Sequence, residues 1–268
     1  MSISNRIAFI GGGNMASALI GGLRRCGHAA TEIVVVEPWS EQRERLAAQH
    51  GVQAQAAADA RLADAALVVW AVKPQSFAEA AAPCAAHVSG ALQLSVMAGI
   101  RSETIVAATG STRVVRAMPN TPALIGRGIA GLFARAAVSA ADRAAVERVL
   151  APTGSLLWFH TEAELDAVTA LSGSGPAYAF YLIEAMVEAG TQMGLAPDAS
   201  RRLAQDTLAG AAALAMQSSE PPTSLRERVT SKGGTTHAAI SSLDASGVKA
   251  AFIRALLAAR DRARELGR

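Results

Sequence analysis

Residues 230–240, "TSKGGTTHAAI", place two glycines and two threonines directly before the pattern of an amphipathic helix. Backbone N–H groups at a helix start that no side chain covers bind anions, and the hydroxyls of Thr235 and Thr236 add further donors. The same pattern is typical of an ordinary helix N-cap, since Thr and Ser are favoured there and Gly is common in the turn before it. The segment therefore predicts either an anion-binding site or a capped helix.

A second glycine-rich loop lies near the N-terminus, where "GGGNMA" at residues 11–16 follows the apolar run at residues 6–10. The segment fits G-x-G-x-x-A between a strand and a helix, which is the context that confirms a dinucleotide-binding turn. In such a turn Gly11 allows the tight bend, Gly13 lets the backbone approach a pyrophosphate, and the small Ala16 permits close helix packing.

Glu37 ends the second apolar run, 24 positions after Gly13 and close to the spacing of ~20 expected for a ribose-binding acid. A carboxylate there favours the free 2′-hydroxyl of NAD and opposes the 2′-phosphate of NADP. Ser40 and Arg43 follow closely, and either reaches a phosphate if Glu37 turns away. A solvated strand end is the other interpretation of Glu37, so the cofactor is expected to be NADP or NAD, with the preference open.

Three further turns follow apolar runs: "AVKP" at 71–74, "MAG" at 97–99 and "MPNTP" at 118–122. Ligands of open parallel sheets bind outside the carboxyl ends of the strands, so these turns are expected to face the cofactor. Lys73 is equally interpretable as a surface residue before a rigid turn. The residues expected to contact the cofactor are Gly11, Gly13, Asn14, Met15, Glu37, Ser40, Ala71, Val72, Lys73, Pro74, Ala98 and Asn120.

The elements that position these turns alternate between strands and helices. Helical patterns at residues 40–50, 76–87 and 140–150 separate short β-branched runs, which predicts an α/β fold with a doubly wound parallel sheet of the Rossmann type. The expected strands span residues 6–10, 33–37, 66–72, 92–96, 113–118, 128–134 and 155–159.

After Phe159 the β pattern disappears and long helical patterns follow, so we expect a dinucleotide-binding domain at residues 1–161 and an all-α domain at residues 162–268. The helical patterns at 177–194 and 198–216 are apolar nearly all round. Such helices must be buried, and a second subunit is the expected cover. A tightly packed monomeric bundle is the alternative.

Composition narrows the class of protein. The chain has 268 residues, 51% hydrophobic and 18% charged, and a net charge of +3 with scattered arginines, which does not indicate nucleic-acid binding. Cys26 and Cys84 have no metal-like spacing, and the five histidines form no ligand pattern, so no metal is expected. Charge or Gly interrupts every apolar run well before membrane-spanning length, and the N-terminus lacks a signal-peptide pattern. A cytoplasmic protein is expected.

Five motifs together carry a resemblance to a known family: "FIGGGNMASALIGG", "AVKPQ", "RAMPNTPA", "LSGSGPAYAF" and "VTSKGGTTHAAI". Their order and approximate spacing resemble the pyrroline-5-carboxylate reductases, from about Arg6 to the last helix. The last motif is the most specific, because glycine fingerprints are shared by many dehydrogenases whereas T-S-x-G-G-T-T before a helix is not.

The resemblance implies hydride transfer from NAD(P)H to the C=N carbon of L-1-pyrroline-5-carboxylate, the last step of proline biosynthesis. It also implies a helical dimerisation domain, a homodimer that in the family is often assembled into a decamer, and a site completed by the partner subunit, with dimer against decamer left open. Family roles make Thr236 the catalytic hydroxyl at the ring nitrogen. The other implied substrate-binding residues are Ser231, Gly233, Gly234, Thr235 and Glu162.

The sequence departs from the family pattern at two positions. Lys232 stands where the family usually has Pro, and its extra cation either strengthens carboxylate binding or faces solvent. Ala58 stands where an asparagine often lies near the adenosine ribose, which puts that contact in doubt.

Two rival functions remain at this stage. A 3-hydroxyacid dehydrogenase also joins a Rossmann domain to helices, but its catalytic Lys and Asn have no counterpart on the helix at 177–194. A non-catalytic dinucleotide-binding regulator is the other alternative, against which the intact loop at 231–236 argues. A protonated cyclic imine is already an electrophile, so the reductase needs only a carboxylate anchor, a hydroxyl at nitrogen and an aligned nicotinamide.

Overall fold

The computed structural model describes residues 6–267, whose contacts divide the chain into two compact units. The first unit runs to Ser174 and includes the chain from Ala259 onward, and the second is Gly175–Ala258. The domain boundary expected between residues 161 and 162 stays a prediction. Among the described residues, no helix combines the length and apolar character needed to cross a membrane.

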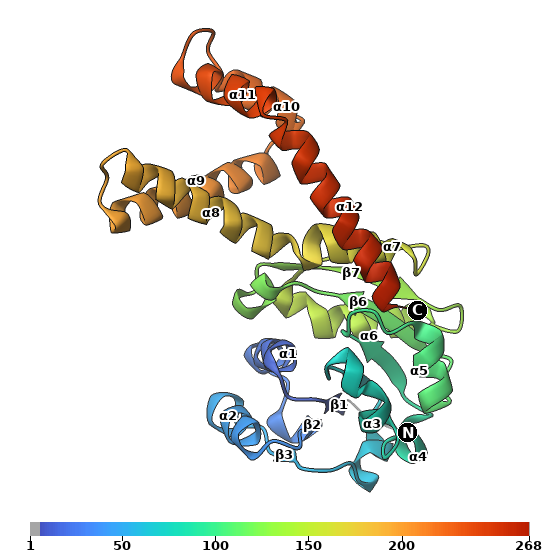
Figure 1. The fold of residues 1–268 in the computed structure, drawn as a ribbon. Helices are drawn as coiled ribbons and strands as arrows, with labels where there is room; N and C mark the ends of the chain where they lie inside the picture. The colour runs from blue at the N-terminus through green and yellow to red at the C-terminus, as the bar shows by residue number, and fades with distance from the viewer. Residues whose placement is uncertain (1–5, 268) are drawn as a thin grey trace. The chain divides into compact units, whose positions relative to one another are not determined.

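The first unit is built on an eight-stranded sheet in the order β3-β2-β1-β4-β5-β6-β7-β8 (Figure 1). All neighbouring strands are parallel except β6 and β7, which pair antiparallel. The expected doubly wound sheet of the Rossmann type is confirmed. The strands are β1 (Ile7–Ile10), β2 (Ile33–Val36), β3 (Ala54–Gln55), β4 (Leu67–Trp70), β5 (Leu92–Ser95), β6 (Val114–Met118), β7 (Gly128–Ala134) and β8 (Gly154–Phe159).

Helices cover both faces of this sheet. They are α1 (Asn14–Arg25), α2 (Ser40–His50), α3 (Phe77–Ala81), α4 (Ala85–Val88), α5 (Ser102–Thr109), α6 (Ala140–Leu150) and α7 (Glu164–Val168). The single helix expected at residues 76–87 is wrong, because α3 and α4 are separated by a turn that contains Pro83. Proline lacks the N–H that a continuous helix needs and clashes with the carbonyl four residues earlier.

Alternation along the strands gives the first unit two apolar cores. Ile7 and Phe9 of β1 point into the core that α1, α2 and α6 cover. Ala8 and Ile10 point into the other core, together with Trp70 of β4 and Phe77 of α3. The carboxyl ends of the central strands are thereby fixed in register, and the turns that follow them start from rigid positions.

The second unit consists of helices. They are α8 (Gly175–Gln192), α9 (Pro197–Gln217), α10 (Pro222–Arg228), α11 (Thr235–Ala245) and the first part of α12 (Val248–Leu266), whose last residues belong to the first unit. α8 and α9 meet at Gly190, where a Cβ atom would lie 2.6 Å from Ser200 Oγ. The rings of Tyr178 and Phe252 also pack edge to face, with centroids 5.8 Å apart.

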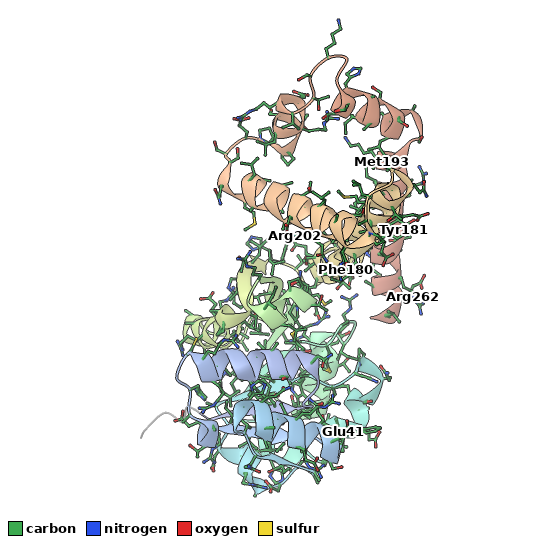
Figure 2. All side chains as sticks on the ribbon, turned by 90° about the vertical axis from the view of Figure 1, so that its left-hand side faces the viewer. Glu41, Phe180, Tyr181, Met193, Arg202 and Arg262 are labelled. Carbon is green, nitrogen blue, oxygen red and sulfur yellow. The ribbon has the colours of Figure 1, made fainter. Side chains whose placement is uncertain are left out.

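Apolar side chains of this unit are largely exposed in the single chain. Phe180 is 59% exposed, and Tyr181 and Met193 are exposed as well (Figure 2). Met216 is 85% exposed. Within Gly175–Ala258 only Gly190, Ser200 and Ala204 are buried. The tightly packed monomeric bundle is therefore wrong, and the apolar surface of α8 and α9 needs a cover from outside the chain.

Candidate cofactor cavity and substrate loop

A cavity of about 720 Å³ lies in the first unit at the carboxyl ends of β1, β2 and β4. This is the edge at which open parallel sheets bind ligands. The residues predicted from the sequence that line the cavity are Gly11, Gly13, Glu37, Ala71, Val72 and Lys73.

The glycine-rich turn after β1 has the geometry that its sequence requires. Gly11 has a φ of +94°, and a Cβ atom there would lie 2.8 Å from the carbonyl oxygen of Ala71. A Cβ atom on Gly13 would meet nothing within 4 Å, so a ligand has room to approach its backbone. Gly13 is also the N-cap of α1 and has no side-chain cap, and Ala16 is fully buried. The uncapped start of α1 thus adjoins the cavity at Gly13, and free N–H groups at a helix start suit an anion.

Glu37 lies at the end of β2 and is only 7% exposed, so the interpretation as a solvated strand end is wrong. Its Oε2 accepts a hydrogen bond from Gly12 N at 2.8 Å, and its Oε1 accepts one from Trp39 N at 3.0 Å. Each carboxylate oxygen keeps a lone pair for a further donor. The side chain is therefore fixed at the cavity wall and still able to accept hydroxyl groups of a ribose.

Arg43 and Ser40, the two residues considered as ligands of a 2′-phosphate, do not line the cavity in the structure. Arg43 Nη1 donates to the carbonyl oxygens of Glu37 and Pro38, at 3.0 and 2.6 Å. Its guanidinium therefore braces the loop. Ser40 is the exposed first residue of α2 and lies outside the cavity lining.

Several other predicted cofactor residues also lie outside this lining: Asn14, Met15, Pro74, Ala98 and Asn120. The Asn120 amide is already engaged, because its Nδ2 donates to the Ser172 carbonyl at 3.2 Å and its Oδ1 accepts from Ile129 N at 3.0 Å. Their roles as cofactor contacts stay predictions.

The structure adds cavity residues that the sequence analysis did not single out: Trp39, Glu41, Gln42, Arg45 and Glu79. Gln42 Nε2 donates to the Gly12 carbonyl at 2.6 Å and so links α2 to the glycine-rich turn. Trp39 is 75% exposed. The sequence offered one signal for Trp39, since a large aromatic residue stands two positions after Glu37, the expected ribose-binding acid.

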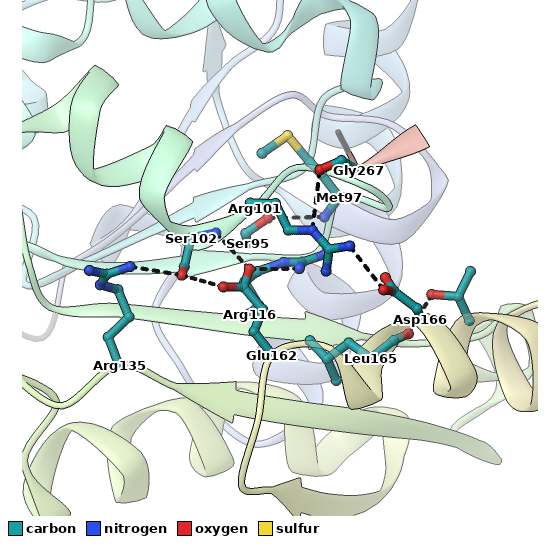
Figure 3. A network of polar contacts seen from close by, with 11 residues as sticks. Ser95, Met97, Arg101, Ser102, Arg116, Arg135, Glu162, Leu165, Asp166 and Gly267 are labelled. Atoms are coloured by element: carbon teal, nitrogen blue, oxygen red, sulfur yellow. Dashed lines mark hydrogen bonds and ion pairs between the residues drawn. The ribbon is translucent and has the colours of Figure 1, made fainter. Parts of the chain in front are cut away.

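Glu162 lies in a polar network within the first unit (Figure 3). Its Oε1 accepts from Ser102 N and from Arg116 Nη1, both at 2.7 Å, and its Oε2 accepts from Ser102 Oγ at 2.7 Å. Burial alone would raise the pKa of Glu162, but the hydrogen bonds from Ser102 and Arg116 outweigh it and hold that pKa below its ordinary value. The carboxylate thereby joins the start of α5 to β6.

The network extends to the end of the chain. Arg101 Nη2 donates to Asp166 Oδ2 at 2.9 Å, and Arg101 Nε donates to the Gly267 carbonyl at 3.2 Å (Figure 3). Arg135 Nη1 donates to Ser102 Oγ at 3.1 Å. Arg116 is 4% exposed, and burial lowers its pKa. Charged side chains thus fix the turn after β5, where Ala98 lies.

In the second unit, the loop between α10 and α11 has no side-chain cap. Gly234 is the N-cap of α11, and no side-chain hydrogen bond reaches the helix start. Thr235 and Thr236 occupy the first two helical positions, so the interpretation as a Thr or Ser cap is wrong. Gly233 has a φ of +77°, which only glycine adopts readily, and Gly234 N donates to the Ser231 carbonyl at 3.0 Å.

The charge around this loop suits an anion. The first turn of α11 contains no acidic residue, and Lys232 and His237 are exposed beside it. The partial positive charge of the helix start adds to these donors. Among the described residues, no group of three or more His, Cys, Asp or Glu side chains is arranged to hold a metal ion.

Comparison with protein families gives a match in each half of the chain. Residues 162–266 match the family described as pyrroline-5-carboxylate reductase dimerisation, and residues 6–99 match the family described as NADP oxidoreductase, coenzyme F420-dependent. The dimerisation match coincides with the helices that expose apolar side chains.

Individual relatives match over nearly the whole chain. The pyrroline-5-carboxylate reductase of Pseudomonas aeruginosa is 46% identical over 265 residues, covering 97% of this chain and 96% of the relative. A solved pyrroline-5-carboxylate reductase from Coxiella burnetii superposes with a TM-score of 0.90 at 35% identity, covering 99% of both chains. A pyrroline carboxylate reductase from Plasmodium falciparum, solved with NADP bound, has a TM-score of 0.88 at 25% identity and covers 100% of both chains.

Proposed function

This chain belongs to the pyrroline-5-carboxylate reductase family, and we propose that it reduces L-1-pyrroline-5-carboxylate to L-proline with NADPH or NADH. The observation that carries the proposal is the 46% identity to the Pseudomonas aeruginosa reductase over 97% of this chain. The cavity in the first unit and the uncapped loop in the second are proposed to supply the two binding functions that the reaction needs.

The cavity at β1, β2 and β4 is proposed to bind the dinucleotide. The uncapped start of α1 beyond Gly13 suits the pyrophosphate, and the fixed carboxylate of Glu37 suits the adenosine ribose. Bound there, the reduced cofactor supplies the hydride. Cavity-lining Ala71, Val72 and Lys73 follow β4 and are proposed to contact it as well. The NADP in the Plasmodium falciparum relative supports this assignment.

The loop before α11 is proposed to bind the substrate. The amides of Gly233 and Thr235 and the Ser231 hydroxyl would hold the carboxylate, and the Thr236 hydroxyl would hydrogen-bond the ring nitrogen. The Gly234 amide, which donates to the Ser231 carbonyl in the unliganded loop, would join them by exchanging that bond for the carboxylate. Hydrogen bonds from neutral donors to a charged group contribute about 1.5–3 kcal/mol each. Two or three of them orient a substrate this small, and no side-chain cap occupies the donors at the start of α11.

Glu162 is proposed to support the substrate end as a positioning residue. Its carboxylate holds Ser102 N and Ser102 Oγ, and both of its oxygens are occupied by protein donors. An effect through the turn after β5 is therefore better supported than direct contact with substrate.

The second unit is proposed to form a homodimer, with α8 and α9 covered by the partner. Support comes from the dimerisation-family match and from the exposure of Phe180, Tyr181 and Met216. Further assembly of dimers into a decamer and a cytoplasmic location complete the proposal.

The decisive test mixes the purified protein with pyrroline-5-carboxylate and either NADPH or NADH, and follows the near-ultraviolet absorbance of the reduced nicotinamide. The proposal predicts loss of that absorbance and stoichiometric formation of proline. Cofactor binding without oxidation would instead support a regulatory protein. A 3-hydroxyacid dehydrogenase is not supported, since α8 contains neither Lys nor Asn.

A further inference from the structure

Trp39 is an exposed tryptophan on the wall of the cavity. It is 75% exposed, whereas Trp70 is fully buried in a core. The third tryptophan, Trp158, is engaged elsewhere: its Nε1 donates to Glu147 Oε1 at 2.7 Å, and the Arg143 guanidinium lies 4.6 Å from its ring centroid. A large apolar ring left in water is costly, and burying it against a ligand recovers that free energy.

The backbone that carries the indole is held on both sides. Trp39 N donates to Glu37 Oε1 at 3.0 Å, and Arg43 N donates to the Trp39 carbonyl at 3.1 Å as the first turn of α2 forms. The Arg43 guanidinium also bonds the two preceding carbonyls, of Glu37 and Pro38. The ring is therefore presented from an ordered position, which lowers the entropy cost of stacking on a ligand.

The neighbouring cavity wall is apolar and made of small residues: Pro38, Ala56, Ala57 and Ala58. Small side chains leave room for a flat ring. A dinucleotide whose pyrophosphate lies at Gly13 and whose ribose lies at Glu37 has only its adenine left to place beyond the ribose. Trp39 follows Glu37 by two residues in the same cavity lining.

We propose that the Trp39 indole stacks on the adenine ring of the bound dinucleotide. This inference rests on the proposed function, because it takes the cavity as the cofactor site. NADH and NADPH carry the same adenine, so Trp39 strengthens the binding of both by the same factor. Discrimination between the two cofactors is assigned instead to Glu37, whose fixed carboxylate is proposed to bind the adenosine ribose.

The test measures dissociation constants by calorimetry for ADP-ribose, NADH and NADPH. The proteins are wild type, Trp39→Phe, Trp39→Ala and Ile125→Ala, the last being a control because Ile125 is also 75% exposed but lies outside the cavity lining. Trp39→Ala is expected to raise all three constants about tenfold, the low end of what an aromatic contact to a base contributes. Trp39→Phe keeps a ring and raises them about threefold or less, and Ile125→Ala leaves them unchanged.

Two results would overturn the proposal. In one, Trp39→Ala binds all three ligands as tightly as wild type. In the other, Trp39→Ala lowers the molecular mass of the assembly, measured by sedimentation, but leaves the nucleotide affinity unchanged. That result would mean that a second copy of the chain covers the indole. ADP-ribose cannot react, so its binding reports on Trp39 even if the protein fails to reduce pyrroline-5-carboxylate. Failure of that turnover alone would instead count against the proposed function.

Discussion

The two units of this chain stabilise their helices by different means. The first buries two apolar cores, one on each face of an eight-stranded sheet, and adds a network of buried charges around Arg116. The second exposes most of the apolar side chains of α8 and α9 and buries only Gly190, Ser200 and Ala204. The first unit therefore has the core of an independent folding unit, whereas the second depends on an external cover.

The difference also separates two chemical tasks. A rigid sheet edge suits a cofactor that needs fixed contacts along its length, and the cavity lies at that edge. The loop proposed to bind the substrate lies instead in the second unit, whose exposed apolar helices need a cover. Mutations in the first unit should accordingly change cofactor binding and stability, whereas mutations in the second should change turnover and association.

The largest expected effect is on the stability of the first unit. Glu162→Gln leaves the charge of Arg116, which is 4% exposed, without its carboxylate partner. We expect the free energy of unfolding to fall by about 3 kcal/mol, measured by denaturant titration. Glu41→Gln breaks an exposed pair with Arg45 and should cost less than about 0.5 kcal/mol. Equal losses in the two variants would show that the network does not stabilise the fold.

The next effect is on turnover. Thr236→Ala should lower kcat about 100-fold, because it removes the hydroxyl proposed to bond the ring nitrogen in the transition state. The dissociation constant for NADPH should stay within about twofold, since the cavity belongs to the first unit. Thr236→Ser keeps the hydroxyl and should retain most activity. Parallel losses of turnover and cofactor affinity in Thr236→Ala would mean that the loop serves folding.

A smaller effect is expected where α8 and α9 pack. Gly190→Ala places a Cβ atom 2.6 Å from Ser200 Oγ and should lower the free energy of unfolding by about 2 kcal/mol. Because the second unit depends on association, its unfolding midpoint should also shift with protein concentration. Gly210→Ala is the matched control in α9, since its Cβ atom meets nothing within 4 Å. A midpoint independent of concentration would contradict the dependence on a partner.

The smallest effect is a pH dependence of the Glu162 network. The pKa of Glu162 in the folded chain is held below its ordinary value of 4.5, so its stabilisation is complete above pH 4.5 and is lost as pH falls through the lower folded-state pKa. The difference in unfolding free energy between wild type and Glu162→Gln should therefore narrow on acidification below 4.5. A difference that widens there would mean that the pKa shift has the opposite sign.

The sequence predicted the sheet well because β-branched runs between helical patterns have few other structures to adopt. All seven expected strands occur, whereas β3 was missed because two residues carry no alternation. The helix at 76–87 failed for a local reason that was visible in the sequence, namely Pro83. The need of α8 for a cover was also foreseeable, because a helix that is apolar nearly all round has no solvent face. In α9 the exposed ion pairs Arg201–Asp198 and Arg202–Asp206 mark a polar face beside the exposed apolar side chains.

Site contacts between distant residues were less predictable. Glu162 contacts Ser102 and Arg116, which lie 60 and 46 positions away, and no local pattern encodes such pairs. The burial of Glu37 depends on the Gly12 and Trp39 amides, which the fingerprint alone does not reveal. The absence of a side-chain cap on α11 likewise became visible only in the backbone structure. Thr235 and Thr236 are residue types that suit a cap, but they lie inside the helix.

The central claim is that main-chain amides at the start of α11 hold the carboxylate of the substrate. A crystal structure of the full-length protein with NADP and L-proline tests it most directly. The account predicts the proline carboxylate within hydrogen-bond distance of the amides around Gly234, with the ring nitrogen at the Thr236 hydroxyl. Proline bound away from that loop, or a loop whose amides bond only to protein, would contradict it.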